Sequence, residues 1–93
     1  MKPVKFSSHA RWQMELRGAS EEEVVHAIKS VKWEDAKMNK FQSKYRFDFN
    51  RIALTNQKFY KYKTVEPILA EEADKIVVIT VKVYYSNEKE VRQ

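Results

Sequence analysis

The chain has 93 residues, of which 43% are hydrophobic and 33% are charged, and its formal net charge is +5. This length supports one modest core, so we expect a single domain over residues 1–93. The absence of cysteine excludes disulfides and thiolate zinc sites, which fits a cytoplasmic location. The apolar runs are short, so neither a membrane span nor a secretion signal is expected. The basic excess favours acidic partners, either nucleic acid or protein.

A first helix is expected to start at the serine pair 7–8, which is a suitable N-cap, and to run to about Leu16. Its residues follow one another at about 100 degrees around the helix axis. His9, Gln13 and Arg17 therefore form a polar stripe within or beside the face that turns inward. Polar side chains in that position need hydrogen-bond partners elsewhere in the fold.

A second helix is expected to begin shortly after the first one ends. Gly18, the only glycine, is predicted just beyond the first helix in the left-handed conformation, where a residue without a Cβ meets no clash. Ser20 and Glu23 have the spacing of a capping box, so the second helix starts after Ser20 and reaches about Val31. The segment 34–43 has no clear period and is expected to be a connection with a short edge strand.

From residue 44 onward the apolar pattern has a period of two, which indicates strands. The first strand carries alternating aromatic residues up to position 49, and Asn50 marks an expected shift in register. A second strand covers 59–70 even though it contains Pro67, which we expect at an edge or a bulge.

Residues 76–85 have the strongest strand pattern of the chain. The odd-numbered set is wholly apolar or aromatic, so it is assigned to the side covered by the helices; it comprises Val77, Ile79, Val81, Val83 and Tyr85. The even-numbered set then faces away; it comprises Ile76, Val78, Thr80, Lys82 and Tyr84. The predicted fold class is α+β, with two N-terminal helices packed on one face of a three- or four-stranded antiparallel sheet.

The uncovered sheet face is the predicted functional surface. It would present cations interleaved with an aromatic ring, from Lys44, Arg46, Thr80, Lys82 and Tyr84. Cations neutralise phosphates and an aromatic ring stacks on a base, which are the requirements for binding single-stranded RNA. The alternative is a solvated face whose lysines prevent aggregation at the sheet edge.

A spaced set of residues in the N-terminal part resembles a known family. The set is Phe6-Ser7-Ser8-His9-Ala10, Met14, Arg17-Gly18-Ala19-Ser20 and Val24, and it is similar to the signature of the domain-of-unknown-function family four-two-five-eight. The segment from Pro67 to Val81 is similar to the final hairpin of that family, so the resemblance spans about residues 6–85. The family often has an arginine where this chain has Gln13.

This family resembles the RelE-like and BrnT-like toxins, so the resemblance implies a RelE-like fold, RNA cleavage without a metal or other cofactor, and an acidic antitoxin-like protein partner. Such cleavage deprotonates a 2′-hydroxyl, stabilises a charged phosphate and protonates the leaving oxygen. His9 would be the acid or base. Arg17, Arg46 and Lys82 would stabilise the phosphate, and Lys44, Thr80 and Tyr84 would hold the substrate.

Each of these roles has a structural alternative. His9 could cap the first helix or form a hydrogen bond inside the core, and Arg17 could pair with a carboxylate or bind carbonyls at the end of its helix. No metal site is expected, because neither His9 nor His26 has a second ligand one helical turn away.

Two functions therefore remain open: a metal-independent endoribonuclease of toxin–antitoxin type, and a non-catalytic RNA- or protein-binding module. A homodimer is a further alternative, for which the aromatic segment 59–62 could supply the contact.

Overall fold

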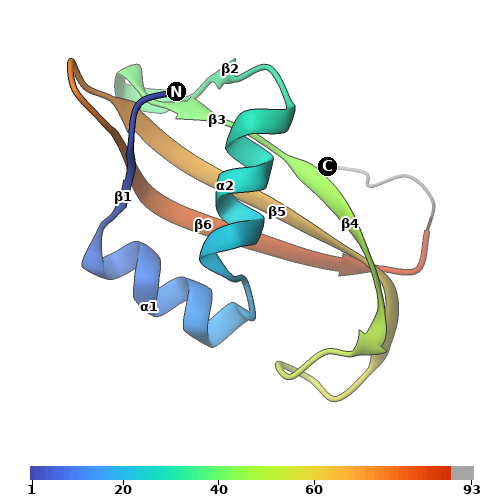
Figure 1. The fold of residues 1–93 in the computed structure, drawn as a ribbon. Helices are drawn as coiled ribbons and strands as arrows, with labels where there is room; N and C mark the ends of the chain where they lie inside the picture. Colours follow the sequence, from blue (N-terminus) through green and yellow to red (C-terminus); the bar gives the residue numbers. More distant parts are fainter. Residues whose placement is uncertain (89–93) are drawn as a thin grey trace.

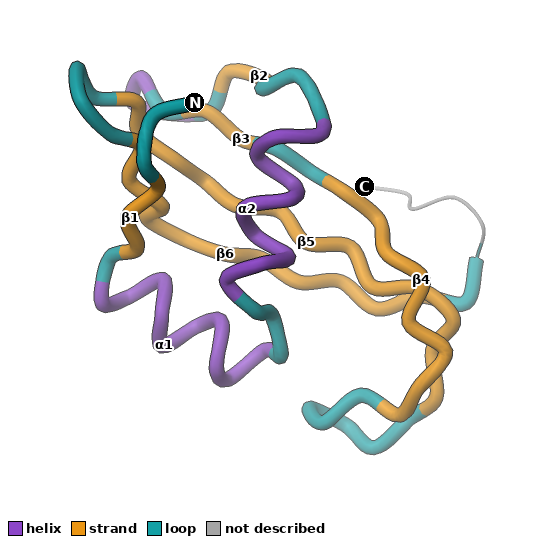
Figure 2. Tube along the Cα trace, viewed as in Figure 1, coloured by secondary structure: helices purple, strands orange, loops and turns teal. Residues whose placement is uncertain are grey.

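The computed structural model describes residues 1–88 and has two helices packed on one face of a six-stranded sheet. Figures 1 and 2 show α2 in front of the long strands and α1 beside β6. The elements in chain order are β1 (Val4–Phe6), α1 (Ser8–Arg17), α2 (Glu21–Ser30), β2 (Glu34–Asp35), the short 3-10 helix η1 (Lys37–Asn39), β3 (Phe41–Gln42), β4 (Tyr45–Ile52), β5 (Phe59–Glu71) and β6 (Ile76–Ser86).

The predicted α+β class is confirmed, but the sheet has more strands than the three or four expected. β5 is the central strand and pairs with β6 along one side. Its other side is shared by β4 and β3, and β2 lies outside β3. β1 pairs with β6 in parallel, whereas the other pairs are antiparallel. The short edge strand expected in the segment 34–43 is present, as the two-residue strands β3 and β2, of which β2 lies at the sheet edge. β1 was not expected, because its three residues are too few for a period of two to be recognised in the sequence.

The predicted helix boundaries are confirmed by their caps. The Ser7 hydroxyl accepts the backbone N–H of Ala10 at the start of α1. Gly18 ends α1 with a φ of 85°, in the left-handed region. Ser20 and Glu23 form both hydrogen bonds of a capping box. The two helices are thereby joined by a turn of three residues, 18–20, which fixes where each one starts and ends.

α1 lies along the outer edge of β6 and binds its backbone. The Val81 N–H donates to Gln13 Oε1 at 2.9 Å, and a guanidinium N–H of Arg17 donates to the Val81 carbonyl oxygen at 2.8 Å. Nearer the start of α1, the Ser7 hydroxyl donates to the Ile79 carbonyl oxygen. Two members of the polar stripe predicted on α1, Gln13 and Arg17, thus find partners in the strand edge, where no neighbouring strand would otherwise satisfy the backbone. The third, His9, is exposed.

β6 contains a bulge, and the side-chain orientation predicted for this strand is wrong on the N-terminal side of it. Ile68 pairs with Thr80 but Leu69 pairs with Val78, so Ile79 has no residue opposite it. The extra residue reverses the alternation. Ile76 and Val78, predicted to face away from the helices, lie instead in the core. The prediction was wrong for the odd-numbered Val77 and Ile79 and right for those beyond the bulge.

Pro67 lies inside the central strand rather than at an edge. Its backbone faces the segment between β3 and β4, where Ser43 donates its N–H to the Pro67 carbonyl oxygen at 3.2 Å. A proline cannot return the second hydrogen bond of such a pair. The interruption between β3 and β4 falls opposite Pro67. We expected Pro67 at an edge or a bulge. The edge position was wrong, and the bulge lies one residue further along, where the register of β5 and β6 shifts between Ile68 and Leu69.

Between the helices and the sheet lies a small apolar core that includes Val24, Ile28, Val65 and Leu69. One cation is buried beside it: Lys63 is 3% exposed and donates to the Gly18 carbonyl oxygen and to the Glu23 carboxylate, both at 2.8 Å. Lys63 therefore fixes β5 to the turn between the two helices.

Candidate nucleic-acid interface

The outward face, by which we mean the sheet face opposite α1 and α2, carries side chains in rows across three strands. Arg46 on β4 pairs with Thr64 on β5, and Thr64 pairs with Tyr84 on β6. These three side chains therefore form one row across the sheet. Arg46 and Tyr84 are exposed, and Tyr84 has 41% of its surface accessible.

The next row along the strands contains a carboxylate between two lysines. Glu66 pairs with Lys82 on one side. On the other side Tyr45 pairs with Val65, so the preceding Lys44 lies opposite Glu66. Glu66 is only 4% exposed, whereas Lys82 is exposed.

Glu66 is the residue of this face that the sequence analysis missed. The Tyr84 hydroxyl lies 3.4 Å from its carboxylate, and within residues 1–88 no cation forms an ion pair with it. The signal was present in the alternation of β5, because Thr64, Glu66 and Ile68 share one face by a period of two. Pro67 obscured that pattern.

The environment of Tyr84 raises the pKa of its hydroxyl above the usual 10.0. Burial is the largest cause, followed by the negative charge of Glu66 and the hydrogen bond to it, while the charge of Arg17 acts in the opposite direction. The hydroxyl therefore keeps its proton at neutral pH and can donate a hydrogen bond.

Next to these rows, the guanidinium of Arg46 stacks over the ring of Tyr62 with a distance of 4.6 Å to the ring centre. The row that contains Tyr62 includes Asp48 on β4 and Ser86 on β6. Arginine held flat against an aromatic ring is oriented as well as charged, and it leaves N–H groups free for a phosphate.

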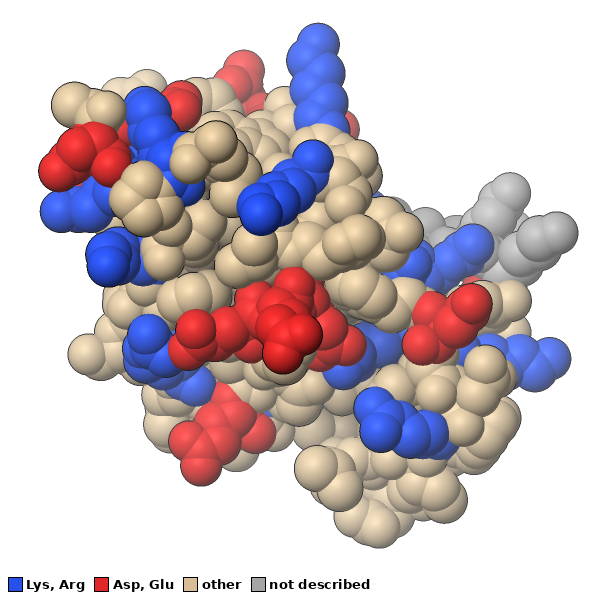
Figure 3. Space-filling model, viewed as in Figure 1, with Lys and Arg blue, Asp and Glu red and all other residues tan. Residues whose placement is uncertain are grey.

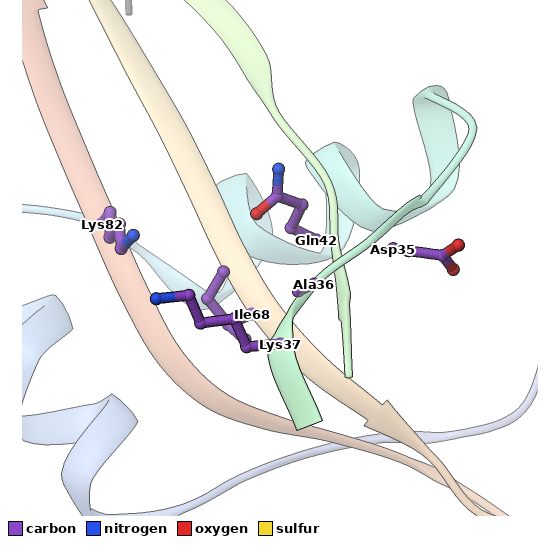
Figure 4. A pocket seen from close by; sticks show the side chains of 6 residues that line it. All are labelled: Asp35, Ala36, Lys37, Gln42, Ile68 and Lys82. Carbon is purple, nitrogen blue, oxygen red and sulfur yellow. The ribbon is translucent and has the colours of Figure 1, made fainter. Parts of the chain in front are cut away.

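A hollow of about 570 Å³ adjoins Lys82 at the end of the outward face. Figure 4 shows Lys82 of β6 and Lys37 of η1 with their amino groups directed toward each other above Ile68 of β5. Gln42 of β3 borders the same space, while the carboxylate of Asp35 points away from it. Asp35 is thus a lining residue whose carboxylate is turned outward, and the hollow itself presents two cations, an amide and an apolar floor, which suits a phosphate and the face of a base.

The helix side of the molecule differs in charge. Figure 3 shows an acidic cluster at its centre, over the start of α2, where Glu21, Glu22 and Glu23 form the first turn. These carboxylates stabilise the helix through its dipole. A polyanion is therefore not attracted to that part of the surface.

The structure brings five of the seven predicted site residues to the outward face; they are Lys44, Arg46, Thr80, Lys82 and Tyr84. Arg17 lies at the margin of this face, on the outer edge of β6, with one guanidinium N–H bound to Val81. The structural alternative had suggested a carbonyl at the end of the helix that carries Arg17. The carbonyl that Arg17 binds belongs instead to β6.

His9 is not joined to that face by any hydrogen bond or ion pair among residues 1–88. Its exposed ring lies against Trp12, with 6.0 Å between ring centres. Both structural alternatives for His9 were wrong, because Ser7 is the N-cap of α1 and His9 lies outside the core.

Within the described part of the chain, no cluster of three or more histidine and acidic side chains is arranged to hold a metal ion. Nor is any helix there both long enough and apolar enough to cross a membrane. Comparison of the chain with protein-family models, with curated proteins and with solved structures finds no match in any of the three.

Proposed function

We propose that this chain is a small RNA-binding protein, distantly RelE/BrnT-like, that holds a single RNA strand on its outward face. The observation that supports the proposal is the pair of adjacent rows, Arg46–Thr64–Tyr84 and Lys44–Glu66–Lys82. Three cations and one exposed aromatic ring lie on a surface that the helices leave open. Cations follow the phosphates of a single strand while the ring stacks on a base.

Binding is tested by fluorescence anisotropy with a labelled single-stranded RNA over a range of salt concentrations. We expect Lys82→Ala to weaken binding several-fold and to reduce the dependence of log Kd on log salt concentration by about 0.7, the loss of one phosphate contact. Lys29→Ala is the matched control, because Lys29 is exposed on α2 and its loss changes net charge equally. Equal effects of the two substitutions, or no binding by the parent protein, would contradict the proposal.

The position of Glu66 between two lysines supports a second proposal, that the bound strand is cleaved without a metal. Its carboxylate would take the proton of a 2′-hydroxyl, whose oxygen then bonds to the neighbouring phosphorus as the bond from phosphorus to the 5′-oxygen breaks. Lys44 and Lys82 would stabilise the charge on phosphorus, and the Tyr84 hydroxyl would donate to the leaving oxygen. The products would be a 2′,3′-cyclic phosphate and a 5′-hydroxyl. In this proposal Glu66 takes the role that the sequence had assigned to His9.

Cleavage is tested by incubating the RNA with the protein in EDTA and separating the products. Glu66→Gln should lower the rate by about 10²-fold or more while RNA binding persists. Glu22→Gln, at an exposed position of α2, is the control and should cleave at the parental rate. If RNA is bound but stays intact with every protein, the chain is a non-catalytic binding module. An acidic antitoxin-like partner should displace RNA by occupying the same cations.

A further inference from the structure

The outer edge of β4 is open in the part of the chain that the structure describes. β4 pairs with β5 on one side only, and within residues 1–88 no strand pairs with its other side. Figures 1 and 2 show β4 at the margin of the sheet remote from α1. β4 has eight residues, which is long for an unprotected edge. An open edge of this length is able to pair with another strand.

The direction of the backbone groups on this edge follows from one hydrogen bond. Ser43 donates its N–H to the Pro67 carbonyl oxygen, which makes these two residues a hydrogen-bonded pair of the antiparallel ladder. Such pairs recur at every second residue. Tyr45 and Phe47 therefore direct their N–H and C=O groups toward β5, and Arg46 and Asp48 direct theirs outward.

We propose that a second copy of this chain pairs with this edge, β4 against β4 in antiparallel orientation, with Phe47 opposite the Phe47 of the second copy. In this register Arg46 lies opposite Asp48 of the second copy, and Asp48 lies opposite its Arg46. Within residues 1–88 neither side chain forms an ion pair in the single chain. The dimer would therefore supply two cross-strand ion pairs that the monomer lacks.

Other registers fail on charge or on backbone direction. A shift by one residue would place an outward-directed backbone group opposite an inward-directed one. Pairing centred on Arg46 would place two arginines opposite each other, and pairing centred on Asp48 would place two aspartates opposite each other. Like charges directly opposite are destabilising. The ladder would end at Asn50, whose φ of 51° bends the strand.

The same register is favourable on the helix side of β4. It places Phe47 opposite Phe47 and Tyr45 opposite Phe49, and these rings are only half-buried in the single chain. Aromatic cross-strand pairs stabilise antiparallel sheets, and the contact would remove further apolar surface from water.

The symmetry of such a pair has a consequence for the outward face. A two-fold axis perpendicular to a continuous sheet leaves both outward faces on the same side, so the two sets of rows would form one longer surface. The dimer itself does not depend on RNA binding, because it is argued from backbone direction and charge alone.

The proposal is tested by sedimentation equilibrium of the full chain at sub-millimolar concentration. The parent protein should dimerise. Arg46→Asp and Asp48→Arg should each raise the dissociation constant about tenfold or more, because each places like charges opposite each other twice. The double variant R46D/D48R should dimerise like the parent. An equimolar mixture of the two single variants should form a heterodimer, since one edge is then wholly acidic and the other wholly basic.

Both substituted positions are exposed, and circular dichroism would verify that each variant is folded. A parent protein that stays monomeric would overturn the proposal. A dimer that resists both single substitutions would also overturn it, because the contact would then lie elsewhere. RNA binding is measured separately with Lys82→Ala, because Arg46 belongs both to the edge of β4 and to the outward face, whereas Lys82 lies on β6.

Discussion

Gly18 is the residue with the tightest local requirement. Its φ of 85° lies in the left-handed region, and a Cβ added there would meet the Tyr85 hydroxyl at 2.8 Å. That hydroxyl donates to the Arg17 carbonyl oxygen at 2.7 Å, while Lys63 donates to the carbonyl of Gly18 itself. Backbone conformation and a long-range contact therefore both require glycine at the same point, and they can be separated by mutation.

Replacing Gly18 by alanine should destabilise the protein by about 1–2 kcal/mol from the left-handed backbone, with a further loss from the clash with Tyr85. Urea denaturation measures the change in the free energy of unfolding. In a Tyr85→Phe background the hydroxyl is absent, so Gly18→Ala should cost less than it does in the parent. An equal cost in both backgrounds would mean that Tyr85 does not constrain this turn.

At the scale of elements, the contact between α1 and the edge of β6 determines how this helix lies against the sheet. A helix usually packs on a sheet through apolar side chains alone, but here Gln13 and Arg17 also satisfy the backbone of Val81. Gln13 is 6% exposed, so water cannot readily replace its hydrogen bond. The helix thereby protects part of an edge that would otherwise resemble that of β4.

Gln13→Leu should lower the free energy of unfolding by about 1–3 kcal/mol, because the Val81 N–H is then left without its acceptor. Hydrogen exchange followed by NMR should show faster exchange at the Val81 amide than in the parent. Glu15→Leu, on the exposed side of α1, is the control and should leave that amide unchanged. Slow exchange at Val81 in Gln13→Leu would show that another group protects the edge.

Much of this arrangement could be predicted from the sequence, because caps and periods are local. Ser20 and Glu23 defined the start of α2, and the alternation after residue 44 defined β4. The bulge at Ile79 could not be predicted, since residues 76–79 are all apolar and either face of the strand accepts them. β1 was missed because three residues carry too little pattern.

The candidate site was predicted only in part, because the alternation of a strand is a local pattern but the contacts across the sheet are not. Lys82 and Tyr84 lie beyond the bulge, where the assumed alternation holds, so their outward orientation was predicted correctly. The alternation of β5 placed Glu66 on the outward face, but Pro67 obscured that pattern, and the 4% exposure of Glu66 could be known only from the folded sheet. His9 was expected to contribute to the site, but the sequence could not show that its ring lies against Trp12.

At the scale of the whole molecule, alkaline pH should weaken the fold through its tyrosines. The pKa values of Tyr84 and Tyr85 are both raised above 10.0, in each case mainly by burial, with the charge of Glu66 acting on the first and that of Glu23 on the second. The folded state therefore holds these protons more tightly than the unfolded state does. The resulting stabilisation is complete below pH about 10 and is lost as the pH rises through the folded-state pKa.

The urea concentration at the midpoint of denaturation should accordingly decrease as the pH is raised from about 9 to about 11. Tyr85→Phe should show a smaller fall than the parent, because it has no buried hydroxyl to ionise near the Glu23 carboxylate. The other groups that titrate in this range are common to both proteins, so their effect cancels when the fall in the variant is subtracted from the fall in the parent. Parallel curves for the two proteins would contradict the assignment.

The position of α1 also determines which side chains reach the surface. Neighbouring backbone groups along a strand point in opposite directions. If β6 slid by one residue, the N–H now held by Gln13 would turn toward β5, and Lys82 and Tyr84 would turn toward the apolar core. The amide of Gln13 and the guanidinium of Arg17 thus select one alignment of the last strand, and two hydrogen bonds to a backbone decide where a ligand could be met.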